Sequence, residues 1–207
     1  MATGRSDRRR EPVTLGVTGS LASGKSTFVG FLAELGAETV STDAIVHELL
    51  ARDPETISAV IKRFGAGVRG ESGIDRRKLA AEAFKTPEAI RDLEAILHPR
   101  VEREVLARAG RSEAELFVAE VPLLFESGME RVFDLTAAVI SSGERRLGWA
   151  GERGMSPEQV RGIETRQLAA DEKARRADFV VYNDGTLEDL RVRAAELVDE
   201  VLKEKRA

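Results

Sequence analysis

The chain has 207 residues, of which 42% are hydrophobic and 33% charged, and its formal net charge is −4. The length suits one domain with small additions, and the composition is that of an ordinary globular protein. The Lys and Arg residues are dispersed, which gives no sign of a nucleic-acid partner, and the apolar runs are shorter than the ~20 residues of a membrane span. The chain has no cysteine and therefore no disulfide. We expect a cytoplasmic protein without a nucleic-acid or membrane partner.

Residues 1–11 are expected to form a disordered basic arm. The run Arg8-Arg9-Arg10 is not followed by an apolar segment of signal-peptide type, because the apolar stretch 13–17 is short and continues into a loop. Residues 12–207 are expected to form a single domain.

The stretch 15–27 predicts a strand, a tight loop and the start of a helix. Within it, Gly19 to Ser26 fits G-x-x-x-x-G-K-[ST], the pattern of a phosphate-binding loop. The backbone N–H groups of such a loop surround phosphate oxygens, and Gly19 and Gly24 let the backbone bend close to the ligand. Lys25 brings a positive charge to the outer phosphates, and the Ser26 hydroxyl can ligate the Mg²⁺ that accompanies a nucleoside triphosphate.

Helices alternate with apolar strands along the rest of the chain. Further strands are expected at 38–40, 116–121, 135–140 and 179–182. Helices are expected at 25–35, 44–51, 54–64, after Asp75, 87–97, 99–110, 144–153, 156–170 and 187–202. At His98-Pro99 we expect a kink or break, because the residue before proline avoids the helical region.

This alternation predicts an α/β fold with a mostly parallel sheet, whose ligands bind beyond the carboxyl ends of the strands. We expect a core made of residues 12–43, 111–143 and 177–207. Two helical inserts interrupt it. Residues 44–110 are numerous enough to house a second substrate, and residues 144–176 form a small cationic segment that suits a lid.

Asp43 follows the second predicted strand, so it should lie beside the phosphate loop. A carboxylate there can orient an acceptor hydroxyl and take its proton during phosphoryl transfer. An N-cap of the helix beginning at Ala44 explains the same residue equally well, and the two roles are compatible.

The predicted lid carries several cations. Arginines that close over a transferring group stabilise its charge and exclude water, although each one alone is more typical of a solvated helix face. These residues are Arg145, Arg146, Arg153, Arg161 and Arg166, followed by Lys173, Arg175 and Arg176.

In this order the motifs resemble the dephospho-CoA kinase family, a member of the nucleoside and nucleotide kinase branch of phosphate-loop proteins. The resemblance runs from about residue 15 to 202, and its diagnostic parts are Leu97-His98-Pro99 and Pro122-Leu-Leu-Phe-Glu126. It implies a three-layer α/β sandwich with a five-stranded parallel sheet, a helical CoA-binding insert and a small helical lid. The implied reaction is phosphorylation of the ribose 3′-hydroxyl of dephospho-CoA by ATP, the last step of coenzyme A synthesis.

The resemblance also implies roles for individual residues. Residues for ATP would be Gly19, Ala22, Ser23, Gly24, Lys25, Ser26 and Thr27 at the phosphates and Asn183 at the adenine. Residues for the acceptor would be Asp43, Arg76, His98 and Glu126. Catalysis would fall to Asp43 as base, with Lys25 and Arg153, and Mg²⁺ would be bound by Ser26.

Several of these roles have plain alternatives. Arg76 could be a surface arginine, and His98 could be a hydrogen-bonded structural residue. Glu126 could orient the acceptor or pair with a nearby arginine. Glu120, at the end of the third predicted strand, could hold a Mg²⁺-bound water or be an ordinary strand-end charge.

The chain departs from the family pattern at a few positions. Ser20 and Ala22 replace glycines of the loop, for which we expect a mild cost. Trp149 stands where the family commonly has Arg, so Arg145 or Arg146 would have to supply the lid contact, or transfer would be less efficient. We expect a monomer with ATP and dephospho-CoA as substrates. The alternatives are another small-molecule or nucleoside monophosphate kinase of the same branch, or an ATP-binding regulatory protein without turnover.

Overall fold

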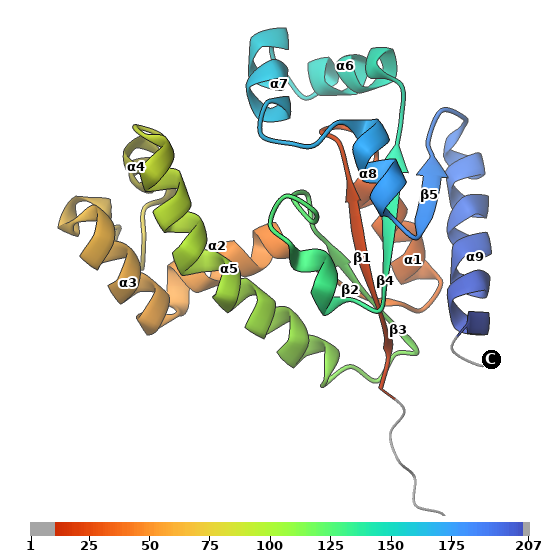
Figure 1. Ribbon diagram of the computed structural model, residues 1–207, viewed down its shortest axis with the longest axis horizontal. Coiled ribbons are helices and arrows are strands. Elements are labelled where there is room, and N and C mark those ends of the chain that lie inside the picture. The colour runs from red at the N-terminus through yellow and green to blue at the C-terminus, as the bar shows by residue number, and fades with distance from the viewer. Residues whose placement is uncertain (1–10, 205–207) are drawn as a thin grey trace, which may run out of the picture.

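The structure is a computed structural model that describes residues 11–204. The predicted basic arm therefore lies outside the described residues, apart from Glu11. Five strands form one parallel sheet in the order β2-β3-β1-β4-β5 (Figure 1). They are β1 (Val13–Gly19), β2 (Glu38–Ser41), β3 (Leu116–Glu120), β4 (Leu135–Ile140) and β5 (Phe179–Tyr182). The predicted α/β class and parallel sheet are confirmed.

Alternating residues of the central strands face two different helical layers, which is why β3 is apolar throughout. Leu116 and Val118 lie in a buried cluster with α1 (Lys25–Glu34) and α9 (Leu187–Glu204). Phe117 and Ala119 lie in a second cluster with α2 (Thr42–Arg52), α5 (Pro87–Ala109) and the short helix η2 (Met129–Val132). The sheet is thus covered on both faces.

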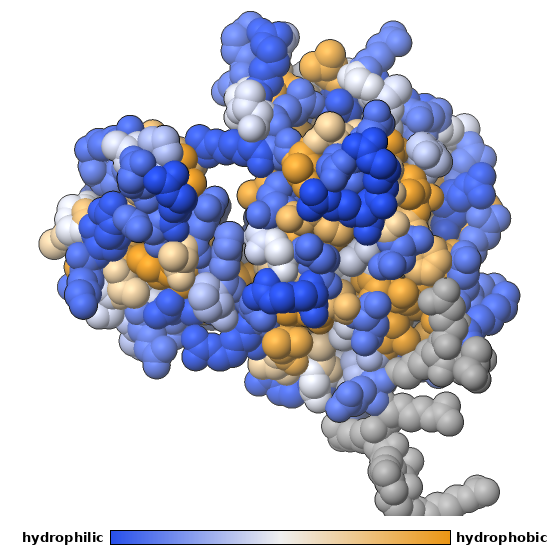
Figure 2. Space-filling view, viewed as in Figure 1, coloured by the Kyte–Doolittle hydropathy of each residue, from blue (hydrophilic) through white to orange (hydrophobic). Residues whose placement is uncertain are grey.

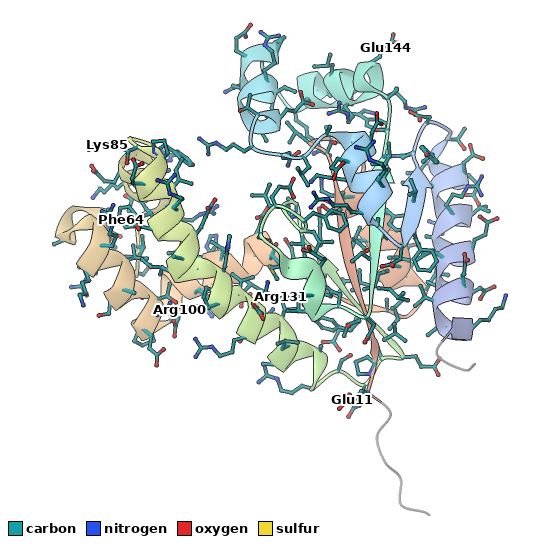
Figure 3. All side chains as sticks on the ribbon, in the orientation of Figure 1. Glu11, Phe64, Lys85, Arg100, Arg131 and Glu144 are labelled. Atoms are coloured by element: carbon teal, nitrogen blue, oxygen red, sulfur yellow. The ribbon has the colours of Figure 1, made fainter. Side chains whose placement is uncertain are left out.

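The first insert has its own apolar core at a distance from the sheet (Figure 1). Besides α2 and α5 it contains α3 (Pro54–Phe64), η1 (Ala66–Val68) and α4 (Arg76–Ala83). The predicted helix starts are confirmed by side-chain caps, because Asp53, Asp75 and Thr86 accept backbone N–H bonds from the first turns of α3, α4 and α5. Charged side chains such as Lys85, between α4 and α5, and Glu144 of α6 (Gly143–Glu152) point outward (Figure 3).

The predicted break at His98-Pro99 is wrong, because α5 continues through Pro99 to Ala109. Proline costs the helix one hydrogen bond, and the Arg100 guanidinium donates to the carbonyl oxygen of Ile96 at 2.7 Å. Leu97 and Val101, on either side of the proline, are both buried. Tertiary packing therefore keeps the helix continuous.

The helix predicted over 156–170 is also wrong in extent. It divides into α7 (Pro157–Glu164) and α8 (Ala170–Arg176), preceded by α6 (Gly143–Glu152). Between α7 and α8 the chain bonds to distant loops: the Gln167 side chain accepts from Leu21 N–H at 3.1 Å, and Leu168 N–H donates to Glu126 at 2.7 Å. Within residues 11–204 no helix is both long and apolar enough to cross a membrane.

Candidate active site

The phosphate loop joins the central strand β1 to α1, and its backbone excludes side chains at two points. A Cβ on Gly19 would lie 2.3 Å from the Val139 carbonyl oxygen, and one on Gly24 would lie 2.2 Å from Asn183 Nδ2. Gly24 also has a φ of 90°, in the region that favours glycine. Ala22 has a φ of 56°, a conformation that costs a non-glycine residue about 1 kcal/mol. That strain is the physical cost of having alanine here.

Lys25 is buried beside the loop, and its Nζ donates to the Ser20 carbonyl oxygen at 2.8 Å. Burial lowers the pKa of Lys25 from 10.5 to about 8, while the carboxylates of Glu120 and Asp43 act to raise it. These two carboxylates are thus close enough to Lys25 to influence its charge. A phosphate bound in the loop would stabilise that charge far better than one carbonyl oxygen does.

The pKa of Lys25 leads to a prediction for nucleotide binding. Phosphate oxygens favour the charged amine, so ATP should raise its pKa above the free value of about 8. Binding should then take up about half a proton at pH 8, and affinity should fall as pH rises beyond that point. Titration calorimetry in buffers of different ionisation heat measures this uptake. The terminal phosphate does not interfere, because phosphate monoesters lose their last proton near pH ~6.

The matched control for this titration is Lys25→Met, which should bind ATP without the proton uptake. Uptake that persists in this variant, or that is absent from the wild type between about pH 7 and 9, would contradict the assignment.

Ser26 and Glu120 meet at the end of the sheet. The Ser26 hydroxyl donates to Glu120 Oε1 at 2.8 Å, and the neighbouring Thr42 hydroxyl donates to the Glu120 carbonyl oxygen at 3.1 Å. Hydroxyl and carboxylate oxygens are the ligands that Mg²⁺ prefers, usually together with substrate phosphates. This pair therefore fits a Mg²⁺ held jointly with a nucleotide.

A cavity of about 380 Å³ lies between the phosphate loop, α6 and the segment that joins β5 to α9. The Arg145 guanidinium lies 4.9 Å from the Trp149 ring centre and donates to the Gly185 carbonyl oxygen at 2.8 Å. Asn183 is buried, and its Nδ2 donates to the Ser23 carbonyl oxygen at 3.0 Å. The cavity is lined by Ala22, Gly24, Thr27, Arg145, Trp149, Glu152, Arg153, Asn183, Gly185, Thr186, Leu187 and Leu190.

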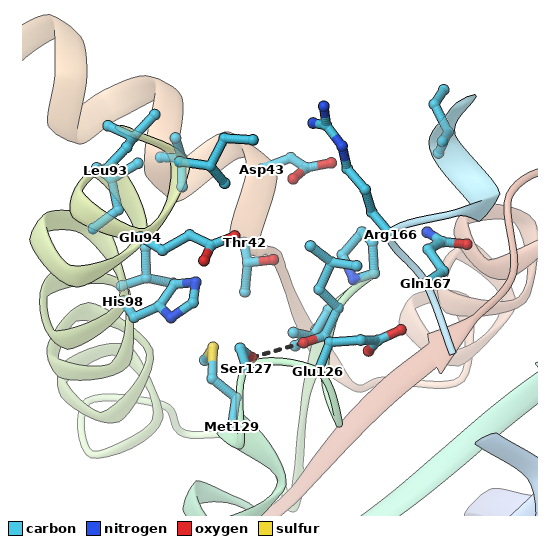
Figure 4. Close-up of a pocket in the computed structure, with 18 of the residues that line it drawn as sticks. Thr42, Asp43, Leu93, Glu94, His98, Glu126, Ser127, Met129, Arg166 and Gln167 are labelled. Carbon is cyan, nitrogen blue, oxygen red and sulfur yellow. Dashed lines mark hydrogen bonds between the residues drawn. The ribbon is translucent and has the colours of Figure 1, made fainter. Parts of the chain in front are cut away.

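A larger cavity, of about 920 Å³, lies between the first insert, the loop after β3 and the exit of α7. The surface is hollowed between the insert and the rest of the molecule (Figure 2), and Asp43, Glu94, His98 and Glu126 surround the space (Figure 4). The wall on the insert side is largely apolar and includes Phe84, Ile90, Leu93, Leu97 and Val101.

Asp43 is exposed at this cavity, in the first turn of α2. Its predicted N-cap role is wrong, because α2 begins at Thr42, two residues before the predicted start, and Ser41 takes the cap position. His98 lines the same cavity. Arg76 is exposed outside this lining, where its guanidinium lies 3.1 Å from Nδ1 of His47.

The arginines of the predicted lid do not act as one group. Arg153 is exposed in the smaller cavity, and Arg166 lines the larger one, where its guanidinium lies 4.3 Å from the Phe84 ring centre. Arg146 forms an ion pair with Glu164 that joins α6 to α7, and Arg161 pairs with Glu158 at 2.8 Å. Only some of the predicted cations therefore face a cavity.

Glu126 pairs with Lys173 at 3.0 Å, so the predicted alternative of an arginine partner is wrong. Sequence reasoning placed Lys173 among the cations of the lid, whereas its side chain is fully buried. One signal was available: Lys173 is the single lysine between residues 86 and 202 of an arginine-rich chain. Lysine shifts its pKa readily on burial, whereas arginine keeps its charge, so the two are not interchangeable at a buried position.

Comparison with known proteins gives consistent results over nearly the whole chain. The family model described as dephospho-CoA kinase matches residues 13–189. A Chlorobaculum tepidum protein named dephospho-CoA kinase is 36% identical over 204 residues, covering 94% of this chain and 98% of its own. A crystal structure of a Thermus thermophilus protein, 36% identical, aligns with a TM-score of 0.79 over 92% of this chain and 98% of its own. A Campylobacter jejuni dephospho-CoA kinase, 27% identical, aligns with a TM-score of 0.67 over 93% of this chain and 98% of its own.

Proposed function

The chain belongs to the dephospho-CoA kinase family, and on that basis we propose how its residues carry out the reaction. The protein is an ATP-dependent kinase with an alcohol group as acceptor, and it catalyses the final step of coenzyme A synthesis. One observation carries the proposed mechanism. Asp43 lines the large cavity and also lies close enough to raise the pKa of Lys25 in the phosphate loop. Acceptor and donor can therefore meet between these two side chains.

In the proposed reaction, Asp43 accepts the proton of the ribose 3′-hydroxyl as its oxygen attacks the γ-phosphorus of ATP. The bond between the γ-phosphorus and the bridging oxygen breaks, and ADP leaves. Lys25 and Arg153 offset the negative charge on the transferring group. Their positions support this role, because Lys25 is buried at the loop and Arg153 lines the cavity next to it.

The smaller cavity suits the nucleoside of ATP. Gly24 and Thr27 of the phosphate-loop region line this cavity, and so does Asn183, which donates to the Ser23 carbonyl oxygen. Trp149 and Arg145 offer flat surfaces on which an adenine can stack. On this proposal Trp149 contributes to base binding in place of the arginine that is common in the family.

We propose that Ser26 and Glu120 hold Mg²⁺, Ser26 directly and Glu120 through a water molecule. The ion would neutralise charge on the outer phosphates of ATP. The 2.8 Å contact between their oxygens supports this pairing.

The larger cavity suits the acceptor. Its apolar wall on the insert fits an extended pantetheine arm, and Glu126 and His98 are proposed contacts for polar parts of dephospho-CoA. Arg76, outside the cavity lining, is a proposed contact for a part of dephospho-CoA that extends beyond the cavity. We propose residues 44–110 as the CoA-binding insert and residues 144–176 as the lid. We further propose that the protein is a monomer and is located in the cytoplasm.

A coupled assay of ADP release with a panel of acceptors tests the function. We expect strong preference for dephospho-CoA over AMP and CMP, with the product carrying a new 3′-phosphate. Preference for a nucleoside monophosphate would instead indicate another kinase of the same branch. Nucleotide binding without turnover on any acceptor would indicate a regulatory protein.

A further inference from the structure

Lys173 is a buried cation to which the proposed mechanism gives no role. Its side chain is fully buried, on α8, which packs against β1 and β4. Its Nζ lies 3.0 Å from Glu126 Oε1, donates to the Pro122 carbonyl oxygen at 2.8 Å and lies 3.4 Å from the Thr18 hydroxyl. These partners belong to two segments. Thr18 directly precedes the phosphate loop, and Pro122 and Glu126 belong to the loop that lines the acceptor cavity.

Glu126 connects this cation to the segment between α7 and α8. Its Oε1 accepts the Leu168 N–H at 2.7 Å as well as facing Lys173. Its Oε2 is buried and has no hydrogen-bond partner among residues 11–204. One carboxylate oxygen therefore holds two segments together, while the side chain itself lines the acceptor cavity.

The residue before Leu168 is bonded to the phosphate loop. Gln167 Oε1 accepts the Leu21 N–H at 3.1 Å. Two consecutive residues between α7 and α8 thus contact both sides of the site: Gln167 the donor loop and Leu168, through Glu126, the acceptor loop. Arg166, which lines the acceptor cavity, directly precedes these two residues.

Stability alone is a poor explanation for a buried ion pair. Taking both charges out of water costs free energy, and apolar residues of similar volume are often as stable. Burial lowers the pKa of Lys173, although Glu126 opposes the shift. A lysine and a carboxylate buried together where three segments of the site converge point to a requirement for fixed geometry.

We propose that Lys173 is a positioning residue that, through Glu126, fixes the connection between α7 and α8 (residues 165–169) between the phosphate loop and the acceptor cavity. Residues 157–166 are then held in a fixed position relative to both the bound ATP and the acceptor. The inference rests on the proposed role of the larger cavity as the acceptor site.

The test uses Lys173→Met, Glu126→Gln and the double variant in the full chain. Lys173→Met leaves a buried carboxylate unpaired and should lower the melting temperature markedly, whereas the double variant has no unpaired charge and should recover much of that loss. The kcat of the double variant with dephospho-CoA should nevertheless stay at least about tenfold below that of the wild type. The ATP dissociation constant of the double variant should change by less than about twofold. Glu172→Gln, which affects only exposed pairs with Arg175 and Arg176 on the same helix, is the matched control.

Hydrogen exchange of residues 157–168 without nucleotide gives a second readout that needs no turnover. Exchange there should be faster in the double variant, with α9 unchanged. A folded double variant whose kcat returns together with its stability, or whose lid exchanges as in the wild type, would overturn the proposal. Lack of turnover on dephospho-CoA in the wild type would instead overturn the proposed acceptor, and the exchange measurement would still test the junction.

Discussion

Replacement of Lys25 by methionine should abolish phosphoryl transfer in a protein that remains fully folded. Hydrogen bonds between charged groups contribute about 1.5–3 kcal/mol, so the ATP dissociation constant should rise about 10- to 100-fold. The kcat should fall by a further factor of about 10²–10³, because the amine offsets charge that develops on the transferring group. Equilibrium binding and single-turnover assays at saturating ATP separate the two effects.

Lys25→Met should at the same time keep or raise the stability of the ligand-free protein. The pKa of Lys25 in the folded state, about 8, lies below its unfolded value of 10.5, mainly through burial, with Lys173 and Arg153 adding to the shift. The unfolded chain therefore binds more protons between these two pH values, and the charged amine costs stability below pH 8. Methionine removes that cost. Lys85→Met, at an exposed lysine paired with Glu82, is the control and should change neither binding nor turnover.

An unchanged ATP affinity in Lys25→Met would contradict the role of Lys25 at the phosphates. A large loss of stability would contradict the electrostatic argument, because it would mean that the bond to the Ser20 carbonyl matters more than desolvation.

Local signals predicted most of the fold. The apolar strands, the caps at Asp53, Asp75 and Thr86, and the phosphate loop each depend on a few consecutive residues, and each was found from the sequence. The strands could be recognised because a parallel sheet covered on both faces requires continuous apolar runs.

The wrong predictions share a different cause, namely contacts between residues far apart in the chain. Pro99 stays helical because its neighbours are buried in the core, and the end of α7 is set by bonds from Gln167 and Leu168 to two distant loops. Asp43 lost its predicted cap role because α2 starts earlier, where the Thr42 hydroxyl bonds to β3. Sequence patterns contain little information about such pairings.

The candidate site divides in the same way. The phosphate loop was evident from its spacing, whereas the burial of Lys173 and its pairing with Glu126 depend on the arrangement of α8 over the sheet. The two cavities likewise arise from how the inserts sit against the sheet, and only the structure assigns their lining residues.

Asp43→Asn should lower kcat with dephospho-CoA by about 10²–10⁴-fold, the range of general-base catalysis. Asparagine keeps the shape and the hydrogen-bonding capacity of the side chain but cannot accept the proton of the hydroxyl. ATP binding should change little, because Asp43 lies on the acceptor side of the phosphate loop. Glu48→Gln removes a carboxylate from the same helix, where it pairs with Arg108, and should leave kcat unchanged.

The assay pH decides whether the Asp43 result can be interpreted. Asp43 helps to raise the pKa of Lys25, so Asp43→Asn should lower that pKa below its present value of about 8. At about pH 7 the amine should still be largely charged, and a loss of kcat there reports on proton transfer. At higher pH the variant should also lose ATP affinity earlier than the wild type. Full activity of Asp43→Asn at about pH 7 would remove Asp43 as the base, while the early loss of ATP affinity would still support its electrostatic contact with Lys25.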